Sequence, residues 1–449
     1  MKRQKDSLIW ILGILAGTLA PVFADTADQS QLTLEGAQQE AVKQSPYYQK
    51  AQAFESETSW GQVRSLAEGF LPQLTISGQT FFAENYSYLN VEFGSPNPIQ
   101  FPELYPQTSL TFDAKMDIFD GFKNVHQLDS ADRKHEAAQI LMSWSAFQIQ
   151  EQVRLKYYQA LAAKILLDMA NENVKTLEDH LRIVQDRLQN GEATKYDLLR
   201  VEVQLSTAKS NQIEAADNVA LSRESLTLAM GLKQDDRLLS GNLPVIDPDK
   251  IVTQITTVDF NERPDVKAKI MQAKSAEDQS AATGSFWVPK VSLIGEYQFY
   301  NIDDYLSTGI TSNDNFRTDY YFGAAATWDI FDGGISLAKA KEDEEKSNGA
   351  EADLKTAQVQ APYDFDLWKR KLISSGSVYQ AKLTDVDEAK ESVRLATLGF
   401  QAGVNTTTDV LDAELDKFTA SAGLVQAQVG MLEAVINLEL AIGKRLNND

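Results

Sequence analysis

The side chains that most often carry chemistry are sparse in this sequence. The three histidines, His126, His135 and His180, are isolated on predicted helical faces, where a surface or packing role is the simpler interpretation. There is no cysteine nucleophile, no glycine-rich loop that would cradle phosphate, and no pair of carboxylates outside turns and helix surfaces. The sequence therefore predicts no enzyme, no metal site and no cofactor.

Carboxylates are the commonest charged groups, with 64 Asp and Glu against 42 Lys and Arg and a formal net charge of −22. Such an acidic surface repels phosphate, so we expect no nucleic-acid partner. Asp409 and Asp412 lie three residues apart on one face of a predicted helix. A capping role explains Asp409 equally well, whereas Asp412 has no such role. What the two carboxylates do depends on the elements that position them.

Those elements occur twice. The motif MDIFDGF at 116–122 returns as WDIFDGG at 328–334, an offset of 212 residues that also aligns Gly191 with Gly403 and Asp197 with Asp409. An internal repeat of this length governs the fold. We predict a first structural repeat over 25–240, a linker over 241–257 and a second repeat over 258–449.

The N-terminus indicates export. Three basic residues precede an apolar segment, Leu8–Ala20, that is too short to cross a bilayer and ends in the small-residue site Val22-Phe23-Ala24. We predict a signal peptide over 1–24. No other apolar stretch approaches the length that a membrane helix needs.

Each repeat begins with a helical segment and continues into a predicted β-hairpin, over 72–119 and 289–331. Apolar residues alternate in these hairpins over about ten positions and are flanked by aromatic residues, as in membrane β-strands. The alternation alone fits a half-buried hairpin of a soluble domain equally well.

A long helical hairpin follows each β-hairpin, over 122–231 and 334–443. Neither Gly nor Pro occurs from 122 to 190, and apolar residues recur with the 3–4 spacing of coiled coils. Gly191 and Gly403 mark the turns between the paired helices. Pro362 is predicted to kink or break the third long helix.

Four strands per chain cannot close a barrel, and lipid does not tolerate an open sheet edge. Two copies would form an eight-stranded barrel filled by its own side chains, whereas three copies would form twelve strands around a lumen. If the protein is a conduit, we therefore expect a homotrimer.

Several motifs resemble TolC-type outer-membrane efflux proteins: LPQL at 71–74, the repeated DIFDG corner, RPDV at 263–266 and AGVNTTTDVLDAELD at 402–416. The resemblance implies a mixed α and β membrane protein, with a trimeric twelve-stranded barrel in outer-membrane lipid and a coiled-coil tunnel through the periplasm. It also implies that an inner-membrane pump and a periplasmic adaptor (membrane fusion) protein dock at the helical tips. The chain would then be the exit duct of a tripartite efflux or type I secretion system.

The resemblance assigns roles to residues at the two tips. Asp409 and Asp412 would form acidic rings at the aperture, and Gly191, Gly403 and Val404 would belong to the adaptor-docking tips. Where the family closes the mouth with an Arg and a Tyr bonded to an Asp, this chain keeps the Asp but not its partners. The corresponding residues are Asp197, Asn405 and Phe400, and Lys195 or Tyr196 could substitute.

An alternative is an exported coiled-coil structural or surface protein with a small β head. It explains the heptads but not the length of the strands or their matching places in both repeats. A general diffusion porin would need more strands per chain and no long helices.

Overall fold

The computed structural model describes residues 31–80, 87–91, 99–103, 108–255, 258–301 and 316–446, so the predicted signal peptide lies outside the described residues. The first half contains β1 (Gln31–Leu32), α1 (Leu34–Gln44), α2 (Pro46–Phe70), β2 (Gln73–Thr80), β3 (Ser87–Val91), β4 (Ile99–Glu103), β5 (Thr108–Phe119), α3 (Lys123–Gln189) and α4 (Lys195–Ala229). The second contains β6 (Leu238–Leu239), α5 (Pro248–Gln254), η2 (Phe260–Glu262), α6 (Pro264–Gly284), η3 (Ser285–Trp287), β7 (Lys290–Asn301), β8 (Phe316–Thr327), α7 (Ile335–Gln401) and α8 (Thr407–Ile442).

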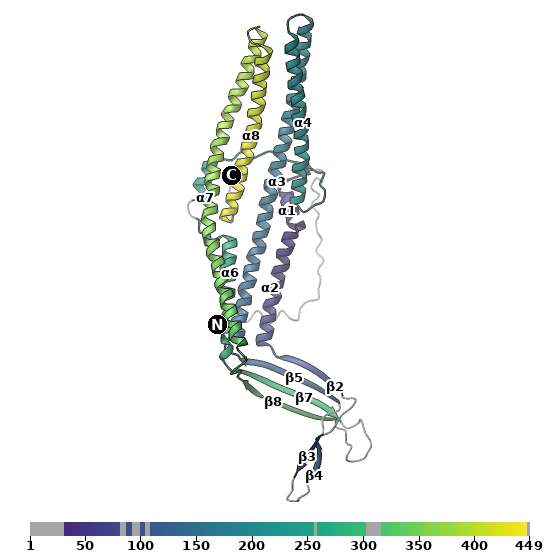
Figure 1. Ribbon diagram of the computed structural model, residues 1–449, viewed down its shortest axis with the longest axis vertical. Coiled ribbons are helices and arrows are strands. Elements are labelled where there is room, and N and C mark those ends of the chain that lie inside the picture. The colour runs from purple at the N-terminus through teal and green to yellow at the C-terminus, as the bar shows by residue number, and fades with distance from the viewer. Residues whose placement is uncertain are drawn as a thin grey trace, which may run out of the picture.

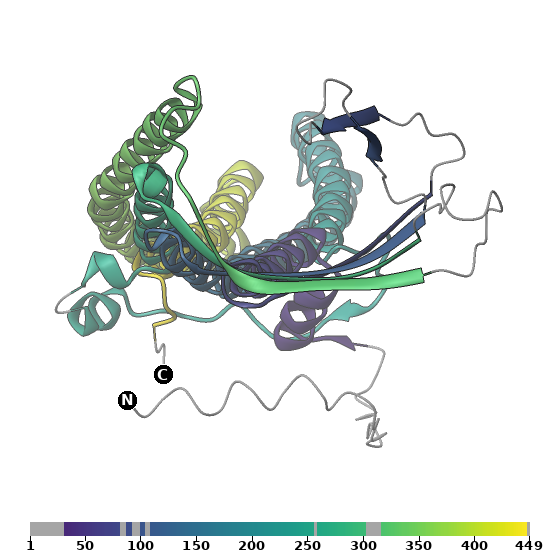
Figure 2. The same cartoon turned by 90° about the horizontal axis from the view of Figure 1, so that it is seen from below.

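The strands of both halves join in one antiparallel sheet with the order β2-β5-β7-β8. This sheet lies at one end of the long helices, and the hairpin turns lie at the other (Figure 1). Seen from below, the sheet is curved and the helices are arranged along an arc (Figure 2). The edge strands β2 and β8 pair with no further strand among the described residues.

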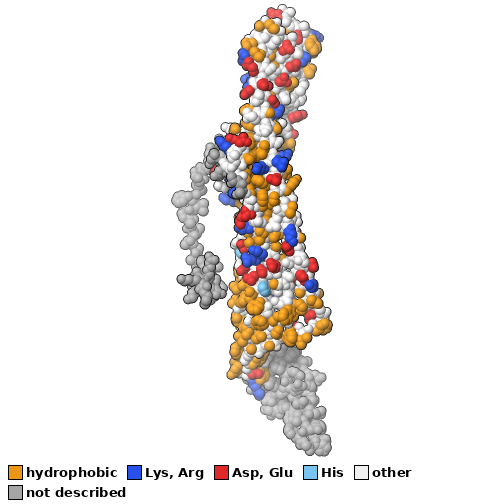
Figure 3. All heavy atoms as spheres, turned by 90° about the vertical axis from the view of Figure 1, so that its left-hand side faces the viewer, with side chains coloured by type: hydrophobic (Ala, Val, Ile, Leu, Met, Phe, Trp, Pro, Cys, Tyr) orange, Lys and Arg blue, Asp and Glu red, His pale blue; other side chains and the backbone are white. Residues whose placement is uncertain are grey.

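Apolar side chains of the sheet are exposed instead of packed in a core. Leu74 is 77% exposed and Phe322 is 79% exposed. In the space-filling view, hydrophobic side chains gather over the sheet and the adjoining helix ends, whereas charged side chains are spread over the helices (Figure 3). A covering outside this single chain is needed to remove this apolar surface from water.

Both strand-to-helix corners are capped by aspartate. The carboxylate of Asp120 accepts from the Asn124 amide at 2.8 Å, and that of Asp332 accepts from the Ser336 amide at 2.9 Å. The repeated DIFDG motif is therefore a structural turn in both halves. The two corners differ in the distance between the strand and the motif. The strand β5 continues to Phe119, inside the motif, whereas β8 ends at Thr327, before it.

Of the kink or break predicted at Pro362, the break is wrong, because α7 continues through this residue. Contacts on both sides of the proline hold the helix. Gln358 donates to Asn261 at 3.1 Å, and Asp364 accepts from Arg263 at 3.2 Å. Tertiary contacts thus compensate for the helical hydrogen bond that proline cannot donate.

The main hydrophobic core lies midway along the helices, where α1, α3, α8, the end of α4 and the segment after it pack together. The Tyr157 hydroxyl lies 2.7 Å from the Leu32 carbonyl oxygen and 2.6 Å from that of Ser240, beside the parallel β1–β6 pair. This contact ties the start of the first repeat to the segment that follows it.

A buried ionic network crosses the same core. The Arg154 Nη1 atom of α3 lies 2.9 Å from Glu151 Oε2 and 2.7 Å from Glu439 Oε2 of α8. Arg445 donates to Glu151 at 2.7 Å, and the Leu446 amide donates to Glu439 at 2.9 Å. Both glutamates are fully buried, and burial raises the pKa of Glu439. The network therefore connects α3 of the first repeat to α8 of the second through buried ion pairs.

Contrary to the sequence-based expectation, α8 is long and apolar enough to cross a membrane, the one such helix among the described residues. In the structure, 56% of its most apolar 18-residue window is buried inside the protein. Met431 and Leu438 belong to the hydrophobic core. A core helix satisfies the same criteria of length and composition, so α8 is explained as part of the core.

Candidate functional site

The candidate site lies at the tips of the two helical hairpins, α3–α4 and α7–α8, at the end opposite to the sheet (Figure 1). Both turns contain a glycine in the left-handed region, Gly191 at φ 76° and Gly403 at φ 76°. In the second tip the Val404 amide donates to the Gly399 carbonyl oxygen at 2.8 Å, and the first tip has the matching bond. The two tips thus share one backbone design, in which glycine ends the first helix.

A capping box begins the second helix of each hairpin. Asp197 Oδ2 accepts from the Thr194 amide at 2.9 Å, and Asp409 Oδ2 accepts from the Thr406 amide at 2.7 Å. The threonine hydroxyls also donate to these carboxylates and, with the amides, hold the pKa of both aspartates below its usual range. Threonine is therefore the N-cap in both tips, and the aspartate is the reciprocal partner.

Asp412 makes the contact between hairpins that the sequence did not reveal. The Arg200 Nη2 atom of α4 lies 3.0 Å from Asp412 Oδ1 of α8 and 3.4 Å from Oδ2. The two residues occupy equivalent positions of the repeats, 212 residues apart. The tips are thus joined by a charged link, although neither Asn405 nor Phe400 supplies it.

Phe400 nevertheless contacts the other hairpin. The Arg187 guanidinium carbon of α3 lies 4.1 Å from the centre of the Phe400 ring, a cation–π contact. Asn405 instead turns back to its own hairpin and donates to the Ala396 carbonyl oxygen at 3.3 Å. Phe400 therefore contacts the first hairpin through its ring and not through a hydrogen bond.

An apolar contact lies beneath these polar ones. Leu411 is fully buried, although it belongs to α8, because it inserts among side chains of the first hairpin. That cluster contains Val174, Leu177, Val184, Val201, Leu205 and Ala208. Leu411 therefore anchors the second hairpin to the first directly beside Asp412.

An acidic groove of about 900 Å³ follows the second hairpin near its tip. Asp409 and Asp412 both line it, together with four further carboxylates: Asp387, Glu388, Glu391 and Asp416. Asp412 is paired with Arg200, and Glu391 is paired with Arg394 at 2.6 Å. The groove is negatively charged beyond these pairs and would attract cations.

The remaining tip residues predicted from the sequence are exposed. Val404 is 80% exposed and Tyr196 is 67% exposed, and Lys195 also faces solvent. The Tyr196 side chain beside Arg200, more than Asp412, raises the pKa of the arginine. No hydrogen bond or ion pair joins Lys195 to the second hairpin among the described residues.

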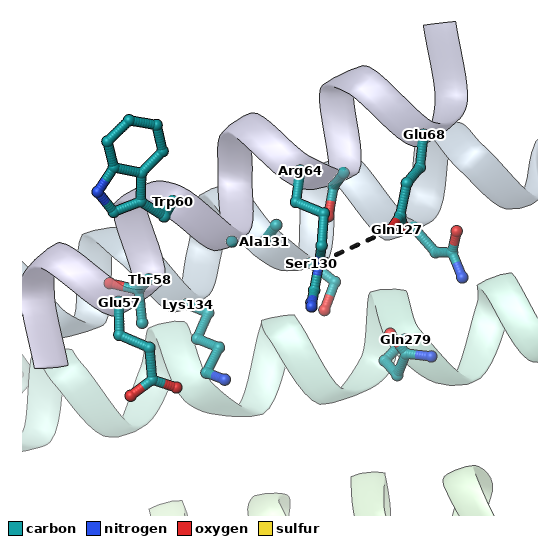
Figure 4. A pocket seen from close by; sticks show the side chains of 12 residues that line it. Glu57, Thr58, Trp60, Arg64, Glu68, Gln127, Ser130, Ala131, Lys134 and Gln279 are labelled. Carbon is teal, nitrogen blue, oxygen red and sulfur yellow. Dashed lines mark ion pairs between the residues drawn. The ribbon is translucent and has the colours of Figure 1, made fainter. Parts of the chain in front are cut away.

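A separate hollow lies far from the tips, where α2, α3 and α6 meet near the sheet (Figure 4). Trp60, Arg64 and Glu68 of α2 line one wall, with Arg64 4.0 Å from Glu68. Gln127 of α3 and Gln279 of α6 line the others. These side chains are mostly exposed polar groups and assemble no catalytic set.

Comparison with known proteins identifies the family. The protein-family model described as "Outer membrane efflux protein" matches residues 37–232 and 260–444 of this chain. The chain belongs to this family. The predicted resemblance to TolC-type proteins and the location in the outer membrane are thereby confirmed.

Individual outer membrane efflux relatives are distant. Outer membrane protein TolC of Vibrio cholerae is 22% identical over 338 residues, which span 72% of this chain and 74% of the relative. The alkaline protease secretion protein AprF of Pseudomonas aeruginosa is 22% identical over 322 residues, spanning 68% and 64%. The family match and these relatives support an efflux duct role.

The fold of this efflux protein matches solved outer-membrane channels. The crystal structure of the outer membrane protein VceC from Vibrio cholerae aligns with a TM-score of 0.71 at 17% identity, covering 92% of this chain and 97% of that one. The structure described as the outer-membrane channel OprN aligns with a TM-score of 0.69 at 15% identity, covering 91% of this chain and 89% of that one. The shared architecture combines long helices with a β domain.

Proposed function

We propose that this protein is the outer-membrane exit duct of a tripartite efflux or type I secretion system. Three copies contribute β2, β5, β7 and β8 to a twelve-stranded barrel in outer-membrane lipid, and their helical hairpins form a tunnel through the periplasm. A periplasmic adaptor protein and an inner-membrane pump meet the duct at the tips, where Gly191, Gly403 and Val404 are exposed.

The observation that carries this proposal is the sheet. It is curved, it exposes apolar side chains, and the edge strands β2 and β8 lack partners among the described residues. Such a sheet needs both lipid and further strands, and β2 of one copy can pair with β8 of the next until the barrel closes. Twelve strands leave a lumen, which four or eight do not.

The proposed gate is the acidic groove at the tips. In a trimer, Asp409 and Asp412 of three copies give two stacked rings of carboxylates that favour cations over anions. Arg200 neutralises Asp412 while the hairpins are in contact. Separation of the hairpins would break this pair and release the Asp412 charge into the lumen, so opening and cation preference are coupled.

The test is conductance in a planar bilayer with detergent-purified protein. We expect a small cation-selective conductance, whose selectivity falls in the double variant Asp409→Asn plus Asp412→Asn. The matched control is Asp236→Asn plus Asp249→Asn, two exposed aspartates away from the tips. Equal selectivity in all three proteins would contradict the aperture assignment but not the duct.

The assembly has its own test. Detergent extracts should contain particles of three chains by light scattering or native mass spectrometry. Protein that stays soluble without detergent, or that forms no pores, would contradict the duct and favour the coiled-coil rod with a β head.

A further inference from the structure

One group of potential metal ligands in the described residues lies far from the tips. His126 and Asp129 of α3 and Asp278 of α6 each offer a donor atom, and these atoms all lie within 4.8 Å of one another. The sequence-based expectation that the histidines are isolated is therefore wrong for His126. The sequence could not show this cluster, because Asp278 reaches it only through the packing of α6 on α3.

The scaffold of this cluster is held together tightly. One helical turn further along α3, the Ser130 hydroxyl donates to the Ser275 carbonyl oxygen of α6 at 2.7 Å, and the Ser275 hydroxyl donates to that of Ser130 at 2.8 Å. Both serines are buried. Gln127 and Gln279, the immediate neighbours of the cluster in sequence, mark the same helix crossing in Figure 4. The three donors are thus placed by two helices with a fixed relative position.

The electrostatics of the cluster call for a cation. The Nδ1 atom of His126 is buried and has no hydrogen-bond partner among the described residues. The Asp129 and Asp278 carboxylates both belong to the cluster. Among the described residues, neither forms an ion pair with a lysine or an arginine, so the two carboxylates lie close together without a cation bonded to them.

We propose that His126, Asp129 and Asp278 bind a divalent transition-metal ion of the Zn²⁺ type. One imidazole nitrogen and two carboxylate oxygens are a donor set that Zn²⁺ accepts, with water as a fourth ligand. Zinc–ligand bonds of about 2.0–2.2 Å require the donors to approach one another from their present spacing. Asp129 is exposed, so its side chain is free to move toward the other two donors.

The consequence is a cross-link between the two repeats. α3 begins shortly after β5, and α6 ends shortly before β7, so the site lies directly beneath the sheet. A metal ion there would fix the first repeat to the second where the helices meet the membrane domain. This inference does not depend on the proposed gate at the opposite end.

The test is a zinc titration of the whole mature protein in detergent, prepared without a polyhistidine tag and washed with chelator. Calorimetry should show one Zn²⁺ site per chain, and zinc should raise the thermal midpoint, reversibly on chelation. His126→Gln, Asp278→Asn and Asp129→Asn should each weaken binding at least tenfold. Asp129→Asn changes an exposed carboxylate into an amide of similar shape, so it keeps the test valid if the other variants fold poorly.

The controls are His180→Gln and Asp217→Asn, which change the same residue types elsewhere on α3 and α4. They should bind zinc like the wild type. Absence of binding by the wild type would overturn the proposal, as would binding that survives all three ligand variants or is weakened equally by the controls. Cobalt as a substitute should give a visible absorption band that the ligand variants lose.

Discussion

Ionic contacts join the repeats of this outer membrane efflux protein in the core and at the tips, and the two regions differ in their surroundings. In the core, Arg154 bonds Glu439 among fully buried groups. At the tips, Arg200 bonds Asp412 with 33% and 55% of the two side chains exposed. A buried charge left without its partner is costly, whereas an exposed pair can separate into water. We therefore expect the buried Arg154–Glu439 pair to persist, and the exposed Arg200–Asp412 pair to separate when the tips move apart.

The apolar contacts follow the same division. The core cluster is large and draws on α1, α3, α8 and the segments between the repeats. The tips hold two small, separate clusters, one of which includes Leu411 from the opposite hairpin. Separation of the tips would therefore expose little apolar surface and leave the core intact. The helices therefore share one hydrophobic core in the middle, whereas at the tips each hairpin has a cluster of its own.

The strongest challenge to this comparison is Arg154→Ala. It leaves two buried glutamates without their main cation, so the free energy of unfolding should fall by about 3–5 kcal/mol. Chemical unfolding in detergent, followed by circular dichroism, measures the change. Arg182→Ala on the same helix is the control, because Arg182 is exposed and its ion-pair partner among the described residues is Asp179. Equal losses in both variants would contradict the contrast between core and surface.

Leu411→Ala should come next in size. It leaves a cavity between the hairpins and should cost about 2–5 kcal/mol locally. Hydrogen exchange should show faster amide exchange in the tip halves of α4 and α8 and unchanged rates in the core. Leu415, one turn along and 48% exposed, provides the control Leu415→Ala. Faster exchange in the core as well would mean that tips and core are not independent.

The exposed pair should have a small effect on stability and a large one on conductance. Arg200→Ala should change the free energy of unfolding by less than about 1 kcal/mol, because exposed ion pairs contribute little. Channel conductance should nevertheless rise, and Asp412→Arg should raise it further through repulsion. The exchanged pair Arg200→Asp plus Asp412→Arg should restore the wild-type conductance. Failure of this exchange to restore it would remove the pair from the gate.

The smallest expected effect is that of pH. The folded-state pKa values of Asp197 and Asp409 lie below their usual 3.8, so both caps stabilise the tips above that pH and weaken as pH falls through the lowered values. The pKa of Glu439 is raised, so its protonation favours the folded core as pH falls. Amide exchange below pH 4 should therefore accelerate at the tips before the core. The opposite order would contradict these assignments.

Much of this architecture could be predicted from one sequence, because each pattern found in one repeat could be checked at the matching position of the other. The glycine of each tip and the Thr–Asp caps recur at matching positions, and each pattern has a local cause. The unbroken helix at Pro362 could not be predicted from the local sequence, because contacts to Asn261 and Arg263, far away in the sequence, support the helix on both sides of the proline.

The site contacts were harder to predict because they cross between hairpins. Nothing in a helical pattern states that Arg187 faces Phe400 or that Arg200 faces Asp412. One signal did exist, since the offset of 212 aligns Arg200 with Asp412 and gives opposite charges at equivalent positions. The side chain of Asn405, which turns back to its own helix, had no such signal.

The equivalence of Arg200 and Asp412 also has a historical meaning. In a half-length ancestor with two identical copies, the same residue would stand at both places, and identical residues cannot form an ion pair of opposite charges. An attractive pair at this position requires that the two copies differ. Joining the halves in one gene thus permitted an asymmetric contact that identical subunits could not form.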